Sequence, residues 1–194
     1  MSMKKESIIT LPNPHLRQKS GKVHVVTEDI KTLIENMTSA SLDWEDSRPH
    51  EISAALAAIQ IDVLERVIIV RSDFDNKEVR DFVPLVNPEI VKYEGELIED
   101  YEGCLSVNGI YGKVKRYERI RVKALDIEGN EVRIKVEGFL ARVLQHEIDH
   151  CNGIVFIDHI KDQTDAFYKL NAQGELKPLT YANHVKDNPD LWDE

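Results

Sequence analysis

Residues Gln145-His146-Glu147-Ile148-Asp149-His150 end a segment in which apolar side chains recur at the spacing of an amphipathic helix. His146 and His150 are four residues apart, so on a helix they share one face and can bind the same ion. Glu147 stands beside the first histidine, close enough to exchange a proton with water at that ion. The segment therefore predicts a metal-binding helix. The alternative is a solvated polar face that carries two ordinary histidines.

The rest of the chain predicts an α+β fold around this helix. A first helix follows Thr27, where apolar residues recur from Ile30 to Met37, and the polar residues 39–51 are predicted to form a loop. Strands are predicted at residues 67–70, 83–86, 90–93, 120–124 and 132–136, the last two as a hairpin. Because helices and strands do not alternate, we expect antiparallel or mixed sheets packed around a central helix that carries the metal motif.

Composition limits the classes of function. The 194 residues contain 25 Lys and Arg against 35 Asp and Glu, a net charge of −10, which argues against a surface devoted to nucleic acid. There is no apolar run of about 18 residues and no secretion signal, so we expect a cytoplasmic protein with no membrane contact. Without repeats or linkers, residues 1–194 are predicted to form one domain, with a core at about 8–160 and a C-terminal extension at 161–194 that includes a small hairpin around Gly174.

A catalytic metal site needs a third protein ligand. In the extended HExxH peptidase motif it would be a histidine at position 156, but this chain has Phe156 there, and Glu175 is the remaining downstream glutamate before the C-terminal residue. Cys104 is the other candidate, because a thiolate binds borderline first-row metals strongly. Cys151 would point about 100° away from His150 on a helix, and we expect it to be a small buried apolar residue.

Three short segments resemble the signature motifs of peptide deformylases. Residues 102–106 read Glu-Gly-Cys-Leu-Ser, and residues 145–150 match the HExxH motif of that family. Residues 53–60 read Ser-Ala-Ala-Leu-Ala-Ala-Ile-Gln, where the family has Gly-x-Gly-x-Ala-Ala-x-Gln. The order and spacing agree, and the resemblance runs from about residue 8 to residue 160.

The resemblance implies a metal-dependent enzyme that removes the formyl group from formyl-methionyl nascent peptides and releases formate, as part of protein biosynthesis. Cys104, His146 and His150 would bind Fe²⁺, with Zn²⁺, Ni²⁺ or Co²⁺ able to take its place. Glu147 would take a proton from water and pass it to the departing amine. The partners expected are N-formylmethionyl peptides and, transiently, the ribosome.

The resemblance also implies how the reaction is supported. The backbone N–H of Leu105 and the side-chain amide of Gln60 would stabilise the developing oxyanion. Glu102 would pair with Arg116 to position the loop that carries the cysteine. Asp149, and Gln145 before the first histidine, are candidates for orienting the ligand imidazoles, with solvent contact as the alternative.

Two positions depart from the family motif, since Ser53 and Ala55 stand where the family has glycines. A positive φ at Ala55 would cost about 1–2 kcal/mol, whereas an ordinary φ would only narrow one wall of the cleft. The acidic residues 42–51 are expected to form a lid or a surface insertion. Two alternatives to a deformylase therefore stay open: an HExxH-type metallopeptidase, and a deformylase-like metal-binding protein with little or no activity.

Overall fold

The computed structural model describes residues 3–192 and has the α+β class predicted from the sequence. Its helices are α1 (Glu28–Asp46), α2 (Gly138–His150) and the short α3 (Tyr181–His184). Its strands are β1 (Ala55–Ala57), β2 (Val67–Arg71), β3 (Phe82–Cys104), β4 (Val107–Leu125), β5 (Glu131–Glu137), β6 (Phe167–Leu170) and β7 (Leu176–Pro178). None of the helices in this part of the chain is long and apolar enough to cross a membrane.

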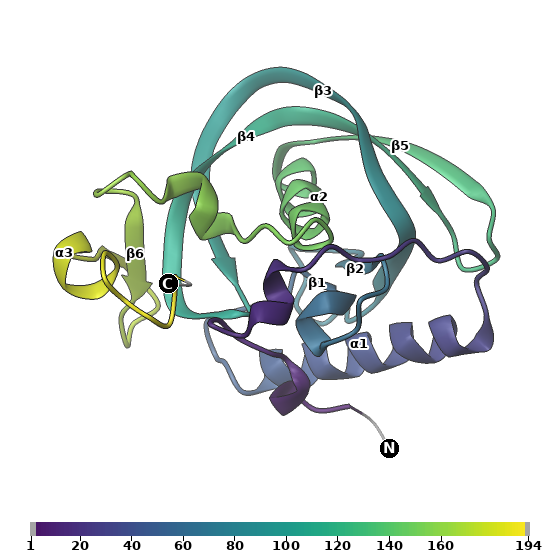
Figure 1. The fold of residues 1–194 in the computed structure, drawn as a ribbon, viewed down its shortest axis with the longest axis horizontal. Helices are drawn as coiled ribbons and strands as arrows, with labels where there is room; N and C mark the ends of the chain where they lie inside the picture. Colours follow the sequence, from purple (N-terminus) through teal and green to yellow (C-terminus); the bar gives the residue numbers. More distant parts are fainter. Residues whose placement is uncertain (1–2, 193–194) are drawn as a thin grey trace.

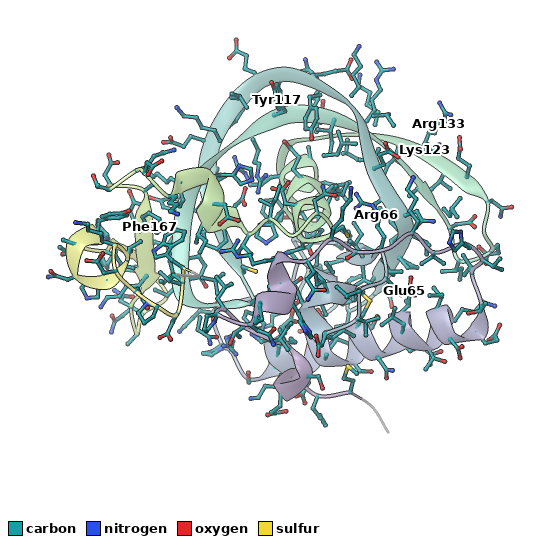
Figure 2. All side chains as sticks on the ribbon, in the orientation of Figure 1. Glu65, Arg66, Tyr117, Lys123, Arg133 and Phe167 are labelled. Atoms are coloured by element: carbon teal, nitrogen blue, oxygen red, sulfur yellow. The ribbon has the colours of Figure 1, made fainter. Side chains whose placement is uncertain are left out.

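The named strands pair in antiparallel fashion in the order β1-β2-β3-β4-β6-β7, with β5 also paired to β4. The long strands β3 and β4 bend together into an arch, and α2 lies beneath it, while α1 runs along the opposite side of β1 and β2 (Figure 1). The predicted hairpin at 120–136 is confirmed as β4 and β5. Its apolar residues face inward, and the side chains of Lys123 and Arg133 lie on the outer side (Figure 2).

The segments predicted as two strands at 83–86 and 90–93 are one continuous strand, so that prediction was wrong. The pairing of β3 with β4 shifts register between Val86 and Glu89, and Asn87 takes a positive φ of 53° there. Such a bulge absorbs the irregular residues without ending the strand. The Asn87 side chain accepts a hydrogen bond from the Val23 N–H at 2.9 Å and donates one to its carbonyl at 2.8 Å, which ties the N-terminal segment to the bulge.

Helix α1 continues through much of the segment predicted as a loop at 39–51, and that prediction was also wrong. Ala40, Ser41, Trp44 and Glu45 are all buried, so the inner face of the helix extends to its last turn. Glu45 is acidic, yet it is buried because its carboxylate accepts a hydrogen bond from Arg71 of β2 at 2.6 Å. The helical part of the acidic segment is therefore a packed element of the fold and not a lid.

Two hydrophobic clusters hold α2 and α1 against the sheet. The first joins α2 to β1, β2, β4 and β5, and its fully buried members include Ile59, Ile68, Ile120, Ala141 and Cys151. The second joins α1 to the other face of β1 and β2 and includes Met37, Leu56, Ile69 and Val86. Cys151 therefore lies in the core, as expected, and burial raises the pKa of its thiol to about 12.

We expect Glu45→Ala to lower the free energy of unfolding by about 3–5 kcal/mol, because it leaves the Arg71 guanidinium buried without its counter-charge. Urea denaturation measures the change. The control is Asp46→Ala, one residue further along, which removes an exposed pair with Arg80 and is expected to cost less than about 1 kcal/mol. Equal losses in the two variants would contradict the role given to Glu45.

Candidate active site

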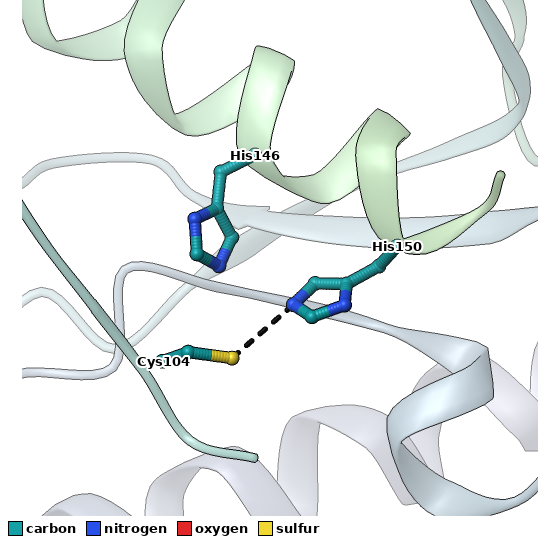
Figure 3. Close-up of side chains that lie close together, drawn as sticks. All are labelled: Cys104, His146 and His150. Atoms are coloured by element: carbon teal, nitrogen blue, oxygen red, sulfur yellow. Dashed lines mark hydrogen bonds between the residues drawn. The ribbon is translucent and has the colours of Figure 1, made fainter. Parts of the chain in front are cut away.

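Three side chains predicted as metal ligands converge between the end of β3 and the last turns of α2. Cys104 is the last residue of β3, and His146 and His150 lie one turn apart on α2 (Figure 3). Their ligand atoms all lie within 4.8 Å of one another, and the Cys104 Sγ is 3.2 Å from the His150 Nε2. Within residues 3–192, these three side chains are the one group of His, Cys, Asp or Glu donors that lie close enough together to hold a metal ion.

The donor set fits a first-row metal ion. Ligand bonds of about 2.0–2.3 Å in a tetrahedron put the ligand atoms roughly 3.5 Å apart, close to the spacing seen here. Burial lowers the pKa of His150, which favours the neutral imidazole that binds metals. Burial also disfavours a charge on His146, but hydrogen bonds to Cys104 and Glu102 outweigh it and raise the pKa of that ring. The neutral His150 imidazole is therefore ready to bind an ion, whereas an ion that binds His146 displaces a proton from that ring.

The other candidates for the third ligand lie elsewhere. The buried Phe156 ring stacks on the His146 ring, with centroids 6.0 Å apart. Glu175 is exposed in the β6–β7 turn, where its carboxylate pairs with Lys177 at 2.9 Å and accepts a hydrogen bond from Asn171. Of the candidates considered from the sequence, Cys104 alone joins the two histidines.

The buried carboxylate of Glu102 connects the elements of the site. It accepts two hydrogen bonds from Arg116 at 2.9 and 3.0 Å, one from Arg142 at 2.8 Å, and contacts the His146 Nδ1 at 2.9 Å. Burial would raise the pKa of Glu102, but the hydrogen bonds from His146 and Arg116 outweigh it and lower that pKa. The carboxylate is therefore ionised, and it turns the His146 Nε2 toward Cys104.

Arg142 is the residue of this network that the sequence reasoning missed. Besides Glu102, its guanidinium donates to the carbonyls of Val114 at 2.8 Å and Ile98 at 2.6 Å, so it joins α2 to both long strands. A signal was present, because Arg142 precedes His146 by four residues and so lies on the same face of the helix.

Neither Gln145 nor Asp149 bonds to a ligand imidazole. Gln145 donates to the Tyr117 carbonyl at 2.9 Å and accepts from the Tyr117 N–H at 3.1 Å, which fastens α2 to β4. Asp149 accepts a hydrogen bond from Arg116 at 2.5 Å and contacts His159 at 2.7 Å. Both residues therefore support the scaffold of the site, and Asp149 acts on Glu102 through Arg116.

Glu147 is buried beside the ligands, and this burial raises the pKa of its carboxyl group to about 7. In the described part of the chain its Oε2 has no hydrogen-bond partner. A carboxyl group that is poised near neutral pH and lacks a partner is suited to general acid–base chemistry.

Gln60 lies on the other side of the thiol. Its Nε2 donates to the Ser106 Oγ at 3.1 Å and is 3.6 Å from the Cys104 Sγ, while its Oε1 accepts from the Ala57 N–H at 2.9 Å. These contacts fix its amide with the Nε2 toward the site. Leu105 follows Cys104 directly in the tight turn between β3 and β4.

A cavity of about 340 Å³ opens beside these groups, a size typical of ligand sites. The residues of the site that line it are Gln60, Cys104, Leu105, His146 and Glu147. The β6–β7 hairpin also lines it, with the half-buried residues Leu170, Gly174 and Leu176. The residues expected to do chemistry therefore share one cavity with part of the C-terminal extension.

The departures from the glycine motif are accommodated without strain. Among non-glycine residues in 3–192, only Asp62 and Asn87 have a positive φ, so Ala55 has an ordinary backbone. It is a buried residue that lines the cavity. Ser53 is buried behind it, where its hydroxyl hydrogen-bonds Ser41 and its N–H donates to Glu45 at 2.8 Å.

Comparisons with known proteins agree with this geometry. The family model for polypeptide deformylase matches residues 5–166, most of the chain. The chain belongs to the peptide deformylase family. One curated relative, the peptide deformylase of Thermomicrobium roseum, is 44% identical over 172 residues, covering 87% of this chain and 93% of the relative. Another, from Halothermothrix orenii, is 45% identical over 148 residues, covering 76% and 88%.

Solved structures place the fold in the same family. A peptide deformylase from Legionella pneumophila superposes with a TM-score of 0.69 at 40% identity, covering 81% of this chain and 86% of that chain. One from Synechococcus elongatus, solved in complex with actinonin, has a TM-score of 0.73 at 29% identity, with 80% of each chain covered. These relatives are enzymes, and membership of the family implies a metal cofactor, which the Cys/His/His group can hold.

We expect Glu102→Gln to weaken metal binding by about 10- to 100-fold, because the His146 Nδ1 loses its charged partner. Competition with a chromophoric chelator measures the metal affinity. Glu99→Gln, an exposed substitution on the same strand, is the matched control and should leave it unchanged. Unaltered affinity in Glu102→Gln would contradict the orienting role of the carboxylate.

Proposed function

We propose that this protein removes the formyl group from formyl-methionyl nascent peptides in the cytoplasm, releasing formate and a free N-terminal amine. The observation that carries the proposal is the buried Cys104–His146–His150 group with the unpaired Glu147 carboxylate beside it, in a cavity large enough for a peptide N-terminus. In this reaction water adds to the formyl carbon, the C–N bond breaks, and the amine takes up a proton.

Cys104, His146 and His150 would hold the metal, which we propose to be Fe²⁺, with Zn²⁺, Ni²⁺ or Co²⁺ able to replace it. The mixed thiolate and imidazole donors favour borderline ions of this kind. When bound, such an ion acts as a Lewis acid that makes water a nucleophile near neutral pH.

Glu147 would accept the proton from the attacking water and deliver it to the amine. Its raised pKa, about 7, suits both halves of that transfer, because the group can hold and release a proton at neutral pH. Its burial also keeps bulk water from competing for the proton.

Gln60 and Leu105 would stabilise the negative charge that develops on the formyl oxygen. The contacts of the Gln60 amide hold its Nε2 toward the site before any substrate arrives. Donors fixed in this way need no reorganisation during the reaction, which is what makes an oxyanion hole effective.

We propose further that the substrate reaches the site through transient contact with the ribosome. We also propose that residues 1–194 act as one domain. Three hydrophobic clusters cover the sheet and both long helices, and the third includes residues from both termini, such as Leu11, Val185 and Leu191. This continuity supports a single folding unit.

Glu147→Gln is expected to lower kcat for formate release from formyl-Met-Ala-Ser by about 10²- to 10⁴-fold while the metal stays bound, because proton transfer is lost and the ligands are kept. Formate is measured by coupled formate dehydrogenase under anaerobic conditions. The control Glu137→Gln, at the exposed start of α2, should keep full activity. An absence of turnover in metal-loaded wild-type protein would instead favour the non-catalytic alternative.

The two cysteines test the ligand set. Cys104→Ala is expected to purify with less than about a tenth of the wild-type metal, since two imidazoles alone bind weakly. Cys151→Ala, which alters a buried core thiol, should keep its metal. Metal analysis by mass spectrometry makes the comparison. A fully metallated and active Cys104→Ala would exclude this site and favour a metallopeptidase with another third ligand.

A further inference from the structure

The β6–β7 hairpin lines the cavity and lies beyond the residues that the family model matches. The family model ends at residue 166, one residue before β6 begins. Leu170 and Leu176 stand directly opposite each other across the hairpin, so their side chains lie on one face, and both line the cavity that contains Glu147. A segment beyond the residues of the family model thus faces the groups expected to do the chemistry.

Leu170 and Leu176 are not packed into the core. Both are half-buried, and in the described part of the chain neither belongs to the three hydrophobic clusters. Two leucines that face a cavity without filling the core leave apolar surface exposed to water, which a ligand with apolar groups would cover. The hairpin therefore offers an apolar surface that a ligand in the cavity can contact.

The hairpin is held in place on two sides. Its base pairs with β4 through Tyr168 opposite Tyr111, and the Tyr168 ring packs edge-on against Tyr101 at 4.9 Å between centroids. Its tip reaches the loop after α1 at Gly174, where φ is +78° and an added Cβ would come within 3.0 Å of the His50 ring. Gly174 is thus needed for the close approach between the tip and this loop.

The loop after α1 is fastened across the same cleft. The Tyr111 hydroxyl donates a hydrogen bond to the Glu51 carboxylate, and Arg48 pairs with Glu51 at 3.2 Å. Tyr111 therefore joins the hairpin through its backbone and the loop through its hydroxyl. A wall that is fixed before substrate binds loses little entropy on contact with it, so its apolar surface can contribute to selectivity.

We propose that Leu170 and Leu176 select peptides with apolar residues directly after the formyl-methionine. The inference rests on the proposed function, since it takes the formyl group to lie beside Cys104 and Glu147. Leu170 and Leu176 line the same cavity as Cys104 and Glu147. An extended peptide advances about 3.3–3.6 Å per residue, so in our proposal the residues after the formyl-methionine span the cavity toward the hairpin. Their side chains then meet the two leucines.

The test compares formyl-Met-Leu-Leu with formyl-Met-Ser-Ser in two measurements. The first is kcat/KM for formate release by the metal-loaded protein, and the second is peptide affinity measured calorimetrically in the Glu147→Gln background, where the peptide stays intact. We expect the wild-type hairpin to favour the Leu-Leu peptide by about fivefold or more in both measurements, from partial burial of an apolar side chain.

The double variant Leu170→Ser/Leu176→Ser should abolish most of that preference. The matched control is Lys169→Ser/Lys177→Ser, which changes the opposing pair on the other, exposed face of the same hairpin and should keep the preference. A wild-type ratio near one, or a ratio unchanged by the leucine variant, would overturn the inference. Failure of the proposed function looks different, because formate release would be absent from both peptides while the affinity ratio still decides the role of the leucines.

Discussion

The ionised carboxylate of Glu102 is the constraint on which the rest of the site depends. A buried carboxylate is stable only when charges and hydrogen bonds compensate for lost hydration, and here Arg116, Arg142 and His146 supply them. These partners come from β4 and α2, so one charge fixes three elements relative to one another. Because Cys104 follows two residues later on β3, the same contacts set the thiol against the ligand imidazoles.

Glu147 is also a buried acid, but its carboxylate is not compensated by partners. Glu102 has its charge compensated by several partners, whereas Glu147, on the same helix as His146, keeps one oxygen without a partner in residues 3–192. A buried carboxylate oxygen without a hydrogen bond lowers the free energy of unfolding. Proteins therefore retain such a group mainly where a reaction needs a free proton acceptor. The compensated carboxylate of Glu102 thus makes the site rigid, and in the proposed function the uncompensated carboxylate of Glu147 would transfer the proton.

Sequence patterns predicted the elements whose signals are local. The helix that ends at His150 and the hairpin at 120–136 follow from hydrophobic periodicity, and the ligand set follows from motif resemblance. The errors arose where distant contacts decide the outcome. The sequence around Glu45 is typical of a solvated loop, because the sequence does not show that Arg71 of β2 lies beside it and compensates its charge. Strand β3 continues past Asn87 because its pairing with β4 accommodates a bulge there. Arg142 was missed for the same reason, since its acceptors lie on other strands.

The central claim is that one thiolate and two imidazoles form the metal site. X-ray absorption at the zinc edge of zinc-loaded protein measures the ligand atoms directly. The account predicts one sulfur at about 2.3 Å and two imidazole nitrogens at about 2.0–2.1 Å, with the remaining position taken by oxygen. A first shell of nitrogen and oxygen without sulfur would contradict it, because Cys104 would then not be a ligand.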